Sequence, residues 1–147
     1  MRRFEWLPGI DHAGLDLPTR QTAGAAGYDL CACEDMEIAP DSIALVGTGL
    51  RIMLPDGEFL AIYARSSLAV KRRLMLANSV GVIDADYFGN PGNGGHIMIP
   101  LWNFGLHPAT VLRGERIAQG IIMSAGKADD DGPTLCSRQG GFGSTGI

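Results

Sequence analysis

The sequence has no excess of positive charge. Its 147 residues include 12 Lys and Arg against 16 Asp and Glu, which gives a net charge of −4. Proteins that bind nucleic acid broadly carry a basic footprint, so this balance argues against nucleic acid as a partner. Any phosphate-bearing ligand must therefore be held by a few local arginines.

Long hydrophobic runs and metal-binding patterns are also missing. No apolar run approaches the roughly 18 residues of a membrane span, and no signal peptide precedes the first strand-like stretch. Cys31, Cys33 and Cys136 form no CxxC pair, and no histidine stands at zinc-ligand spacing. We therefore expect a cytoplasmic protein with reduced thiols and no membrane association.

Short runs of alternating or apolar residues make up most of the chain. Runs such as YDLCAC, EFLAIYA, HIMIPLWN and the stretch at 42–54 recur between turns built from Pro, Gly, Asn or Asp. This pattern is typical of an all-β sandwich or barrel, and the length suits one domain with a real core. Only residues 66–75 (SSLAVKRRLM) favour a helix, which we expect to open on a serine cap.

The chain changes character near its C-terminal end. Residues 1–126 hold the strand-like runs, whereas residues 127–147 are first charged and then rich in glycine and small polar residues. Such a segment cannot bury enough apolar surface to order itself, so we expect a β domain followed by a flexible tail. The tail's GGFGSTG stretch offers unobstructed main-chain NH groups, which can form an anion-binding nest beside Arg138.

Acidic and basic side chains follow apolar runs at several places. Asp84 ends the run GVID, and Asp29 falls within the run GYDL. An acidic side chain in such a position either forms a hydrogen bond within a turn or takes part in catalysis, and the local sequence leaves both interpretations open. Arg65 beside Ser66 and Ser67 suits a phosphate, but it suits an ordinary capped helix with a surface arginine equally well.

In their order along the chain, the motifs AGYDL, ARSSLA, GVIDADYFG, RGERIAQ and GGFGSTG resemble the five motifs of the trimeric deoxyuridine triphosphate nucleotidohydrolases, the dUTPases. The resemblance spans residues 26–146. It implies an all-β, distorted jelly-roll β-barrel with one short helix, assembled as a homotrimer with active sites at subunit interfaces. It also implies a dUTP diphosphatase, which splits dUTP into dUMP and pyrophosphate with Mg²⁺, limits uracil in DNA and supplies dUMP for dTMP synthesis.

The resemblance further implies a role for individual residues. Asp84 would orient and activate the attacking water, while Asp29 would hold hydrated Mg²⁺ through water. Tyr87 would pack beneath the deoxyribose, where a ribose 2′-hydroxyl would clash. The tail would close over the site of a neighbouring subunit. The expected substrate-binding residues are Arg65, Ser66, Ser67, Asn78, Gly81, Ile83, Tyr87, Gln119, Arg138, Phe142, Gly143, Ser144 and Thr145.

Three features depart from the family pattern. Ser67 stands where many members have glycine, and Arg138 lies one residue closer to the glycine pair than is usual. In addition, the segment at 90–96 lengthens the connection after Tyr87. We expect this segment near the rim of the trimer, in contact with the tail.

Two alternatives differ in their chemistry. Deoxycytidine triphosphate deaminases, including bifunctional deaminase/dUTPases, share the fold and carry RSSLA. Here Val70 and Pro100 stand where their further arginine and catalytic glutamate would be, so deamination lacks a proton shuttle. The other alternative is a non-catalytic, nucleotide-sensing regulatory protein. The joint presence of Asp29, Asp84 and Tyr87 argues for catalysis instead.

Overall fold

The computed structural model describes residues 1–132 and 141–142, which fold mainly into β-strands. In these residues there is one short α-helix and one 3₁₀ helix, η1. No helix there is long and apolar enough to cross a lipid bilayer. The elements in chain order are β1 (Arg3–Trp6), β2 (Tyr28–Cys31), β3 (Met36–Ile38), β4 (Ser42–Gly47), β5 (Leu50–Met53), β6 (Glu58–Tyr63), α1 (Ser66–Arg72), β7 (Leu74–Leu76), β8 (Gly81–Asp84), η1 (Ala85–Tyr87), β9 (Met98–Asn103), β10 (Ala109–Val111) and β11 (Arg116–Ser124).

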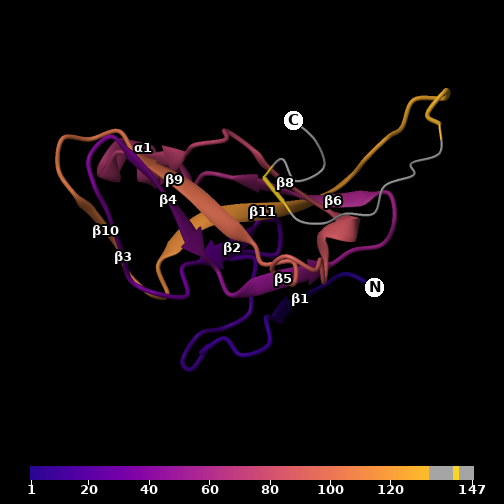
Figure 1. Cartoon of the computed structure of the whole chain (residues 1–147), viewed down its shortest axis with the longest axis horizontal. Helices are drawn as coiled ribbons and strands as arrows, with labels where there is room; N and C mark the ends of the chain where they lie inside the picture. Colours follow the sequence, from indigo (N-terminus) through magenta and orange to yellow (C-terminus); the bar gives the residue numbers. More distant parts are fainter. Residues whose placement is uncertain (133–140, 143–147) are drawn as a thin grey trace.

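Antiparallel pairing joins the strands into two main sheets. One contains β2, β11, β6 and β8 in that order, and the other contains β4, β9 and β7. Two smaller pairs, β1 with β5 and β10 with β3, account for the remaining described strands. Figure 1 shows an elongated body, with α1, β3 and β10 at one end and β6 and β8 toward the other.

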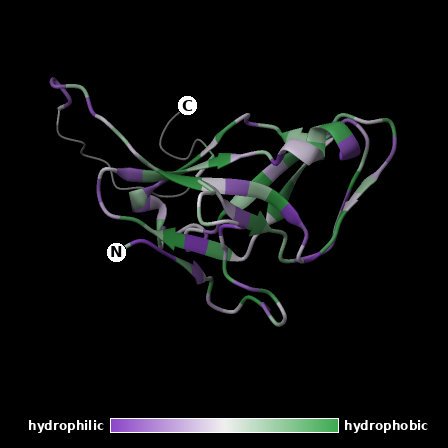
Figure 2. Cartoon of the chain, turned by 180° about the vertical axis from the view of Figure 1, so that it is seen from behind, coloured by the Kyte–Doolittle hydropathy of each residue, from purple (hydrophilic) through white to green (hydrophobic). Residues whose placement is uncertain are grey.

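The inward-facing side chains of both sheets form one continuous hydrophobic core. Leu30, Leu60 and Ile117 from the first sheet and Ile99 and Leu101 from the second are fully buried. Burial of each such side chain contributes about 1.5–3 kcal/mol to stability. Figure 2 shows hydrophobic and hydrophilic residues interleaved along the strands, as expected where one face packs inward. The expectation of an all-β domain with one short helix is therefore confirmed.

The helix is shorter than predicted, and the expected serine cap is wrong. α1 ends at Arg72 rather than at residue 75, because Arg73 adopts a left-handed conformation (φ 56°) and the chain then enters β7. Leu74 is fully buried and pairs with β9, so core packing takes precedence over local helix propensity. The N-cap is Arg65, and no side-chain hydrogen bond caps the helix.

The run predicted at 42–54 is divided into two strands. β4 ends at Gly47 and β5 begins at Leu50, with Gly49 between them at a φ of +72°. A Cβ on Gly49 would lie 2.9 Å from Cγ2 of Ile10, so this position needs glycine for both reasons. The turn allows β4 to pair with β9 while β5 pairs with β1.

Candidate active site

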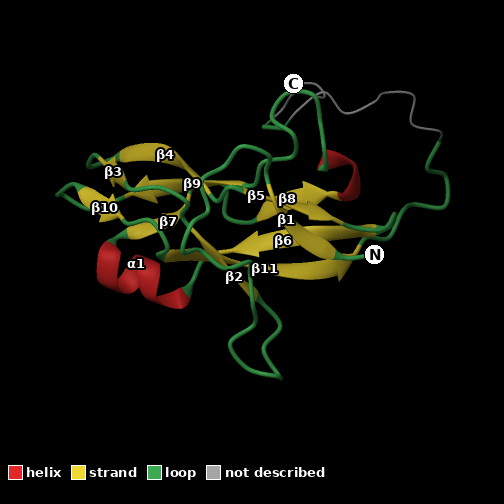
Figure 3. Ribbon diagram, turned by 90° about the horizontal axis from the view of Figure 1, so that it is seen from below, coloured by secondary structure: helices red, strands yellow, loops and turns green. Residues whose placement is uncertain are grey.

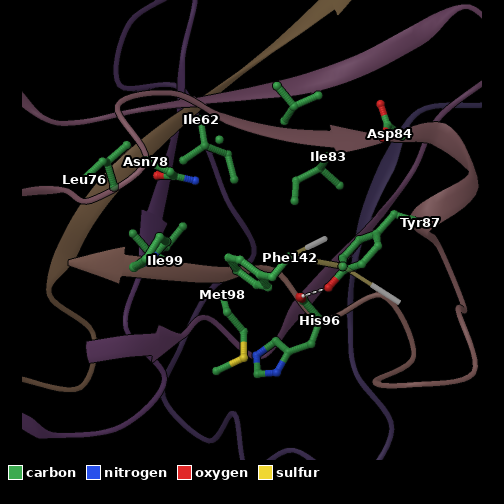
Figure 4. A pocket seen from close by; sticks show the side chains of 14 residues that line it. Ile62, Leu76, Asn78, Ile83, Asp84, Tyr87, His96, Met98, Ile99 and Phe142 are labelled. Atoms are coloured by element: carbon green, nitrogen blue, oxygen red, sulfur yellow. Dashed lines mark hydrogen bonds between the residues drawn. The ribbon is translucent and has the colours of Figure 1, made fainter. Parts of the chain in front are cut away.

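A pocket of about 210 Å³ lies beside β8, between β6, β9 and η1. Gly141 and Phe142 of the C-terminal segment also line it. Six residues singled out from the sequence share this pocket: Asn78, Gly81, Ile83, Asp84, Tyr87 and Phe142. The structure therefore brings together the residues expected to hold a base, a sugar and an attacking water (Figure 4).

Asp84 stands at the junction between β8 and η1. Its backbone is extended (φ −72°, ψ 157°), and η1 begins at the next residue. Its cross-strand partner is Phe59, near the start of β6. Asp84 is half-buried and lines the pocket, so its carboxylate lies at the boundary between the core and the solvent. A carboxylate placed there can accept a proton from a bound water that is shielded from bulk solvent.

Tyr87 is held firmly in the wall of the same pocket. It is 5% exposed, and its Oη donates a hydrogen bond to the main-chain oxygen of His96 at 3.0 Å. The same Oη accepts a hydrogen bond from Nδ2 of Asn93 at 2.8 Å. Gly141 packs on the ring, since a Cβ at that position would lie 3.1 Å from Cε2. The aromatic ring thus presents a fixed surface to the pocket.

At the other end of the pocket, main-chain groups of β8 lie beside the side chains of Ile62, Leu76 and Asn78 (Figure 4). Asn78 lies in the turn between β7 and β8, where its carbonyl accepts a hydrogen bond from the N–H of Val80 at 2.7 Å. Gly81 begins β8 and approaches β6 closely, because a Cβ there would lie 3.1 Å from Cβ of Ile62. β8 is the outer strand of its sheet, so one side of its main chain is not used for pairing within that sheet. The NH and C=O groups of Gly81 and Ile83 are therefore suited to pair with the edge of a planar base.

The C-terminal segment reaches this pocket in its own chain. Phe142 is 65% exposed, and Figure 4 shows its ring in the middle of the pocket, between Ile83 and Met98. Arg138, Gly143, Ser144 and Thr145 lie outside the described residues. Closure of the tail over a neighbour's site stays a prediction.

The residues expected to bind phosphate gather in a second pocket, at the start of α1. Its lining includes Asp29, Arg65, Ser66 and Gln119, together with residues of the loop before β2. Nε of Arg65 lies 3.9 Å from Oδ1 of Asp29, and Nη1 of Arg116 lies 3.3 Å from Oδ2. Two guanidinium groups therefore flank one carboxylate.

Neutral hydrogen-bonding groups complete this second pocket. Nε2 of Gln119 donates to the main-chain oxygen of Ala64 at 3.3 Å. Ser66 borders the pocket, whereas Ser67 is one residue further along α1 and is not part of the lining. Guanidinium, hydroxyl and amide groups are the usual partners of phosphate oxygens, so this pocket can bind a phosphate chain.

Asp29 is the carboxylate available here for a metal ion. Within residues 1–132 and 141–142, no group of three or more His, Cys, Asp or Glu side chains could hold a metal directly. Mg²⁺ keeps several waters and is commonly bound through one or two carboxylates plus phosphate oxygens. A single Asp29 beside a phosphate pocket fits that mode of binding, with the metal held through water.

The two described cysteines are poor candidates for nucleophiles. Burial and the nearby charge of Asp29 raise the pKa of the Cys31 thiol, and burial and Glu34 raise the pKa of the Cys33 thiol. Both side chains are therefore protonated thiols at neutral pH. Cys136 lies outside the described residues.

The roles of two polar residues, Arg116 beside Asp29 and His96 in the first pocket, were not anticipated from the sequence. Arg116 lies within the RGERIAQ motif, and its pairing with Asp29 could have been anticipated only once β2 and β11 were known to be neighbours. His96 lines the first pocket, and its Nε2 accepts a hydrogen bond from the N–H of Gly49 at 2.9 Å. Burial lowers the pKa of His96, which favours the neutral ring that this bond requires. No local signal marks His96 in the sequence.

Asp84 and Arg65 lie at opposite ends of β6. Asp84 pairs with Phe59 near the start of that strand, whereas Arg65 follows its end. At about 3.3 Å per residue, the six steps from position 59 to position 65 span about 20 Å. Figure 3 likewise shows α1 and η1 at opposite ends of the molecule. One chain therefore does not bring Asp84 and the phosphate-binding cluster into a single site.

Comparisons with known proteins show the family of the chain and the fold that it shares. The dUTPase family profile matches residues 13–146. The deoxyuridine 5'-triphosphate nucleotidohydrolase of Lactococcus lactis is 44% identical over 147 residues, covering 99% of this chain and 98% of the relative. The protein of that name from Wolinella succinogenes is 39% identical, covering 92% and 89%. The crystal structure of the Streptococcus mutans dUTPase superposes with a TM-score of 0.83 at 43% identity, covering 86% of this chain and 98% of that one.

Proposed function

This chain belongs to the dUTPase family, with the family's jelly-roll β fold, and hydrolyses dUTP to dUMP and pyrophosphate; we propose that it does so through a water activated by Asp84. The observation that carries this proposal is the position of Asp84, half-buried at the edge of a pocket that also holds Tyr87. In-line attack at phosphorus requires a water held at a defined angle. Asp84 would accept a proton from that water as it attacks the α-phosphorus.

The base and sugar would occupy the first pocket. Asn78 and the main chain of Gly81 and Ile83 would pair with the edge of uracil, and Phe142 would stack on the base. Tyr87 would lie beneath the deoxyribose, since its ring forms the pocket wall and is 5% exposed. The close packing of this ring would leave no room for an additional 2′-hydroxyl.

The phosphates would bind to the second cluster and to the tail. Arg65, Ser66, Ser67 and Gln119 would contact the phosphate oxygens from α1 and β11. From the tail, Arg138, Gly143, Ser144 and Thr145 would contact the outer phosphates. A Mg²⁺ ion bound through water to Asp29 would neutralise charge on the triphosphate and on the leaving pyrophosphate. Arg65 and Arg116 keep positive charge beside Asp29 and would help to hold the same anionic chain.

The separation of the two pockets supports a site shared between subunits. Because Asp84 and Arg65 are about 20 Å apart along β6, a phosphate chain held by Arg65 cannot present its α-phosphorus to Asp84 of the same chain. A homotrimer with active sites at its interfaces would join the two halves from different chains. The closing tail would exclude bulk water from the completed site.

An exposed apolar row supports such an assembly. Ile43 and Met75 are 63% and 37% exposed, and both pair across the sheet with Trp102. Apolar side chains gathered on one face commonly mark a surface that another protein covers. This row on β4, β9 and β7 is a candidate for contact between subunits. We also infer that the enzyme acts in the cytoplasm, in keeping with the free, reduced thiols of Cys31 and Cys33.

The test of the mechanism is the replacement of Asp84 by asparagine. Loss of a general base commonly costs about 10²- to 10⁴-fold, so Asp84→Asn should lower kcat for pyrophosphate release from dUTP by that range. Asp56→Asn is the matched control, because Asp56 is an exposed aspartate in the turn before β6 and is not part of the pocket lining. It should retain activity. A fully active Asp84→Asn enzyme would remove the water-activation hypothesis.

A parallel assay with dCTP tests the deaminase alternative. The strand that would carry the deaminase glutamate has Pro100 instead, and this proline lines the first pocket. We expect no release of ammonia from dCTP. Ammonia release would overturn the assignment to dUTP hydrolysis alone.

A further inference from the structure

The segment at residues 90–96 folds back onto Tyr87. Nδ2 of Asn93 donates to Tyr87 Oη at 2.8 Å, and this Oη donates to the main-chain oxygen of His96 at 3.0 Å (Figure 4 shows the second bond). The phenol is therefore held on its donor and acceptor sides by two residues of one segment. A third contact, from Nδ2 of Asn90 to the main-chain oxygen of Tyr87 at 3.3 Å, ties the segment to η1.

The direction of the Asn93 amide is fixed by its neighbours. Its Oδ1 lies 3.1 Å from the N–H of Gly95 and 2.8 Å from Nδ2 of Asn90, and both of these groups can only donate. The oxygen must face them, so the NH₂ group of Asn93 must face Tyr87. The NH₂ group of Asn93 is therefore the donor to the Tyr87 hydroxyl oxygen, and the hydroxyl hydrogen must point to the main-chain oxygen of His96.

The segment is rigid enough to serve as a support. Gly94 and Gly89 are joined by a main-chain hydrogen bond of 3.0 Å, and Asn90 is 4% exposed. Gly95 has a φ of +90°, and a Cβ there would lie 2.7 Å from the main-chain oxygen of Tyr87. At the far end, the His96 ring accepts a hydrogen bond from the N–H of Gly49, which anchors the segment to the turn before β5.

We propose that Asn93 is a positioning residue that sets the preference for deoxyribose over ribose by locking the Tyr87 ring. This inference rests on the proposed role of Tyr87 beneath the sugar. An apolar wall rejects a ligand with one extra hydroxyl only weakly, because a wall that can retreat by a fraction of an ångström admits the added oxygen. A ring tethered at its hydroxyl on two sides cannot retreat in this way. Because the two hydrogen bonds fix the Tyr87 ring in place, its contact with the sugar can discriminate between deoxyribose and ribose.

The experiment measures kcat/KM for dUTP and for UTP in the full-length enzyme. In Asn93→Ala the ratio of kcat/KM for dUTP to kcat/KM for UTP should fall by about five- to tenfold, as expected for the loss of one buried hydrogen bond. The ratio should fall because kcat/KM for UTP rises, or because it decreases less than kcat/KM for dUTP. Tyr87→Phe keeps the ring but deletes the oxygen, so it removes the bond from Asn93 together with the bond to His96. Its ratio should fall by at least as much as in Asn93→Ala. In the double variant the ratio should fall no further than in Tyr87→Phe, because the bond from Asn93 is already absent from that variant.

The matched control is Asn103→Ala. Asn103 is also a buried asparagine with side-chain hydrogen bonds, to the main chain of Ile38 and His107, but it lies in β9 outside the pocket lining. It should lower the melting temperature without changing the dUTP:UTP ratio. The proposal is overturned if Asn93→Ala behaves like this control, or if the effects of Asn93→Ala and Tyr87→Phe on the ratio multiply.

Two further outcomes separate this proposal from the proposed function. If Asn93→Ala does not fold, Tyr87→Phe alone decides, and an unchanged ratio in that variant overturns the tether. If the unmodified enzyme does not hydrolyse dUTP, or does not prefer dUTP to UTP, the assigned role of Tyr87 fails and the tether's role in selectivity fails with it. An enzyme that prefers dUTP and keeps its ratio in both single variants refutes the tether while leaving the proposed function intact.

Discussion

Gly27 approaches the side chain of Gln119 so closely that a Cβ on Gly27 would lie 2.5 Å from Oε1 and 3.3 Å from Cβ of Gln119. The two residues come from neighbouring elements, because Gly27 immediately precedes β2 and Gln119 pairs with Asp29 across β2 and β11. The absence of a side chain at position 27 therefore allows Gln119 to lie in the phosphate pocket with its Nε2 on the oxygen of Ala64.

Gly27→Ala should weaken substrate binding without unfolding the protein. The added methyl group would displace the flexible Gln119 side chain, and loss of its hydrogen bond corresponds to about 1 kcal/mol, or about a fivefold rise in KM for dUTP. The matched control is Gly24→Ala, since nothing lies within 4 Å of a Cβ at that position. Steady-state kinetics measure both variants. In a Gln119→Ala background the Gly27 substitution should have no further effect on KM, and an additional rise would contradict this explanation.

Asp84 and Arg65 should complement each other when they come from different chains. Asp84→Asn and Arg65→Ala homomers should both be nearly inactive. The two variants are co-expressed with different affinity tags and purified through both tags in turn, so every purified trimer contains both variants. With cyclic symmetry, about one third of its sites then combine an intact Asp84 with an intact Arg65. We expect dUTP hydrolysis at about one third of the unmodified rate.

The alternative outcome of the mixing experiment is equally informative. If the mixed protein is as inactive as its two parents, Asp84 and Arg65 must act from one chain despite their positions at opposite ends of β6. Mixing Asp84→Asn with Asp84→Ala chains is the control, because no site in that mixture contains an intact Asp84.

The shared pocket of Asp84 and Tyr87 was predictable from one local motif, but the distance between Asp84 and Arg65 was not. Asp84 and Tyr87 stand three residues apart in GVIDADYFG, so their shared pocket follows from short-range geometry. Arg65 and Asp84 are distant in sequence, and whether they meet depends on the order of strands in the sheet. The pairing of β6 with β8 places them at opposite ends, which motif spacing alone does not reveal.

Secondary structure was predicted correctly where the pattern of apolar residues had a clear period. It was predicted poorly where contacts with other elements determined the backbone conformation. The run at 66–75 is helical only as far as Arg72, because burial of Leu74 against β9 favours a strand after it. The pairs β1–β5 and β3–β10 involve strands of three or four residues, which are too short to show a period. The support of Tyr87 by Asn93 depends on the return of the 90–96 segment, and no pattern in that glycine-rich stretch indicates the contact.

Removal of the tail should reduce turnover much more than stability. A chain that ends before Arg138 lacks Gly141, which packs on the Tyr87 ring, and Phe142, which lines the pocket. Phe142 is 65% exposed and so contributes little to the core, which predicts a melting temperature close to that of the full chain. Thermal unfolding and the rate of pyrophosphate release measure the two effects. Unchanged turnover would count against closure of the tail over the site.

His96 should make the protein less stable as the pH falls below about 6.5. Burial lowers the pKa of His96 in the folded state from its ordinary value of 6.5, and Glu34 offsets this only in part. Below pH 6.5 the unfolded chain therefore binds a proton that the folded chain excludes, so the free energy of unfolding falls until the pH reaches the lower folded pKa. Urea unfolding between pH 5 and pH 8 measures this slope. His96→Gln should flatten it, because the amide oxygen can still accept the N–H of Gly49 but does not titrate. If the slope is the same in this variant, the loss of stability arises from other groups.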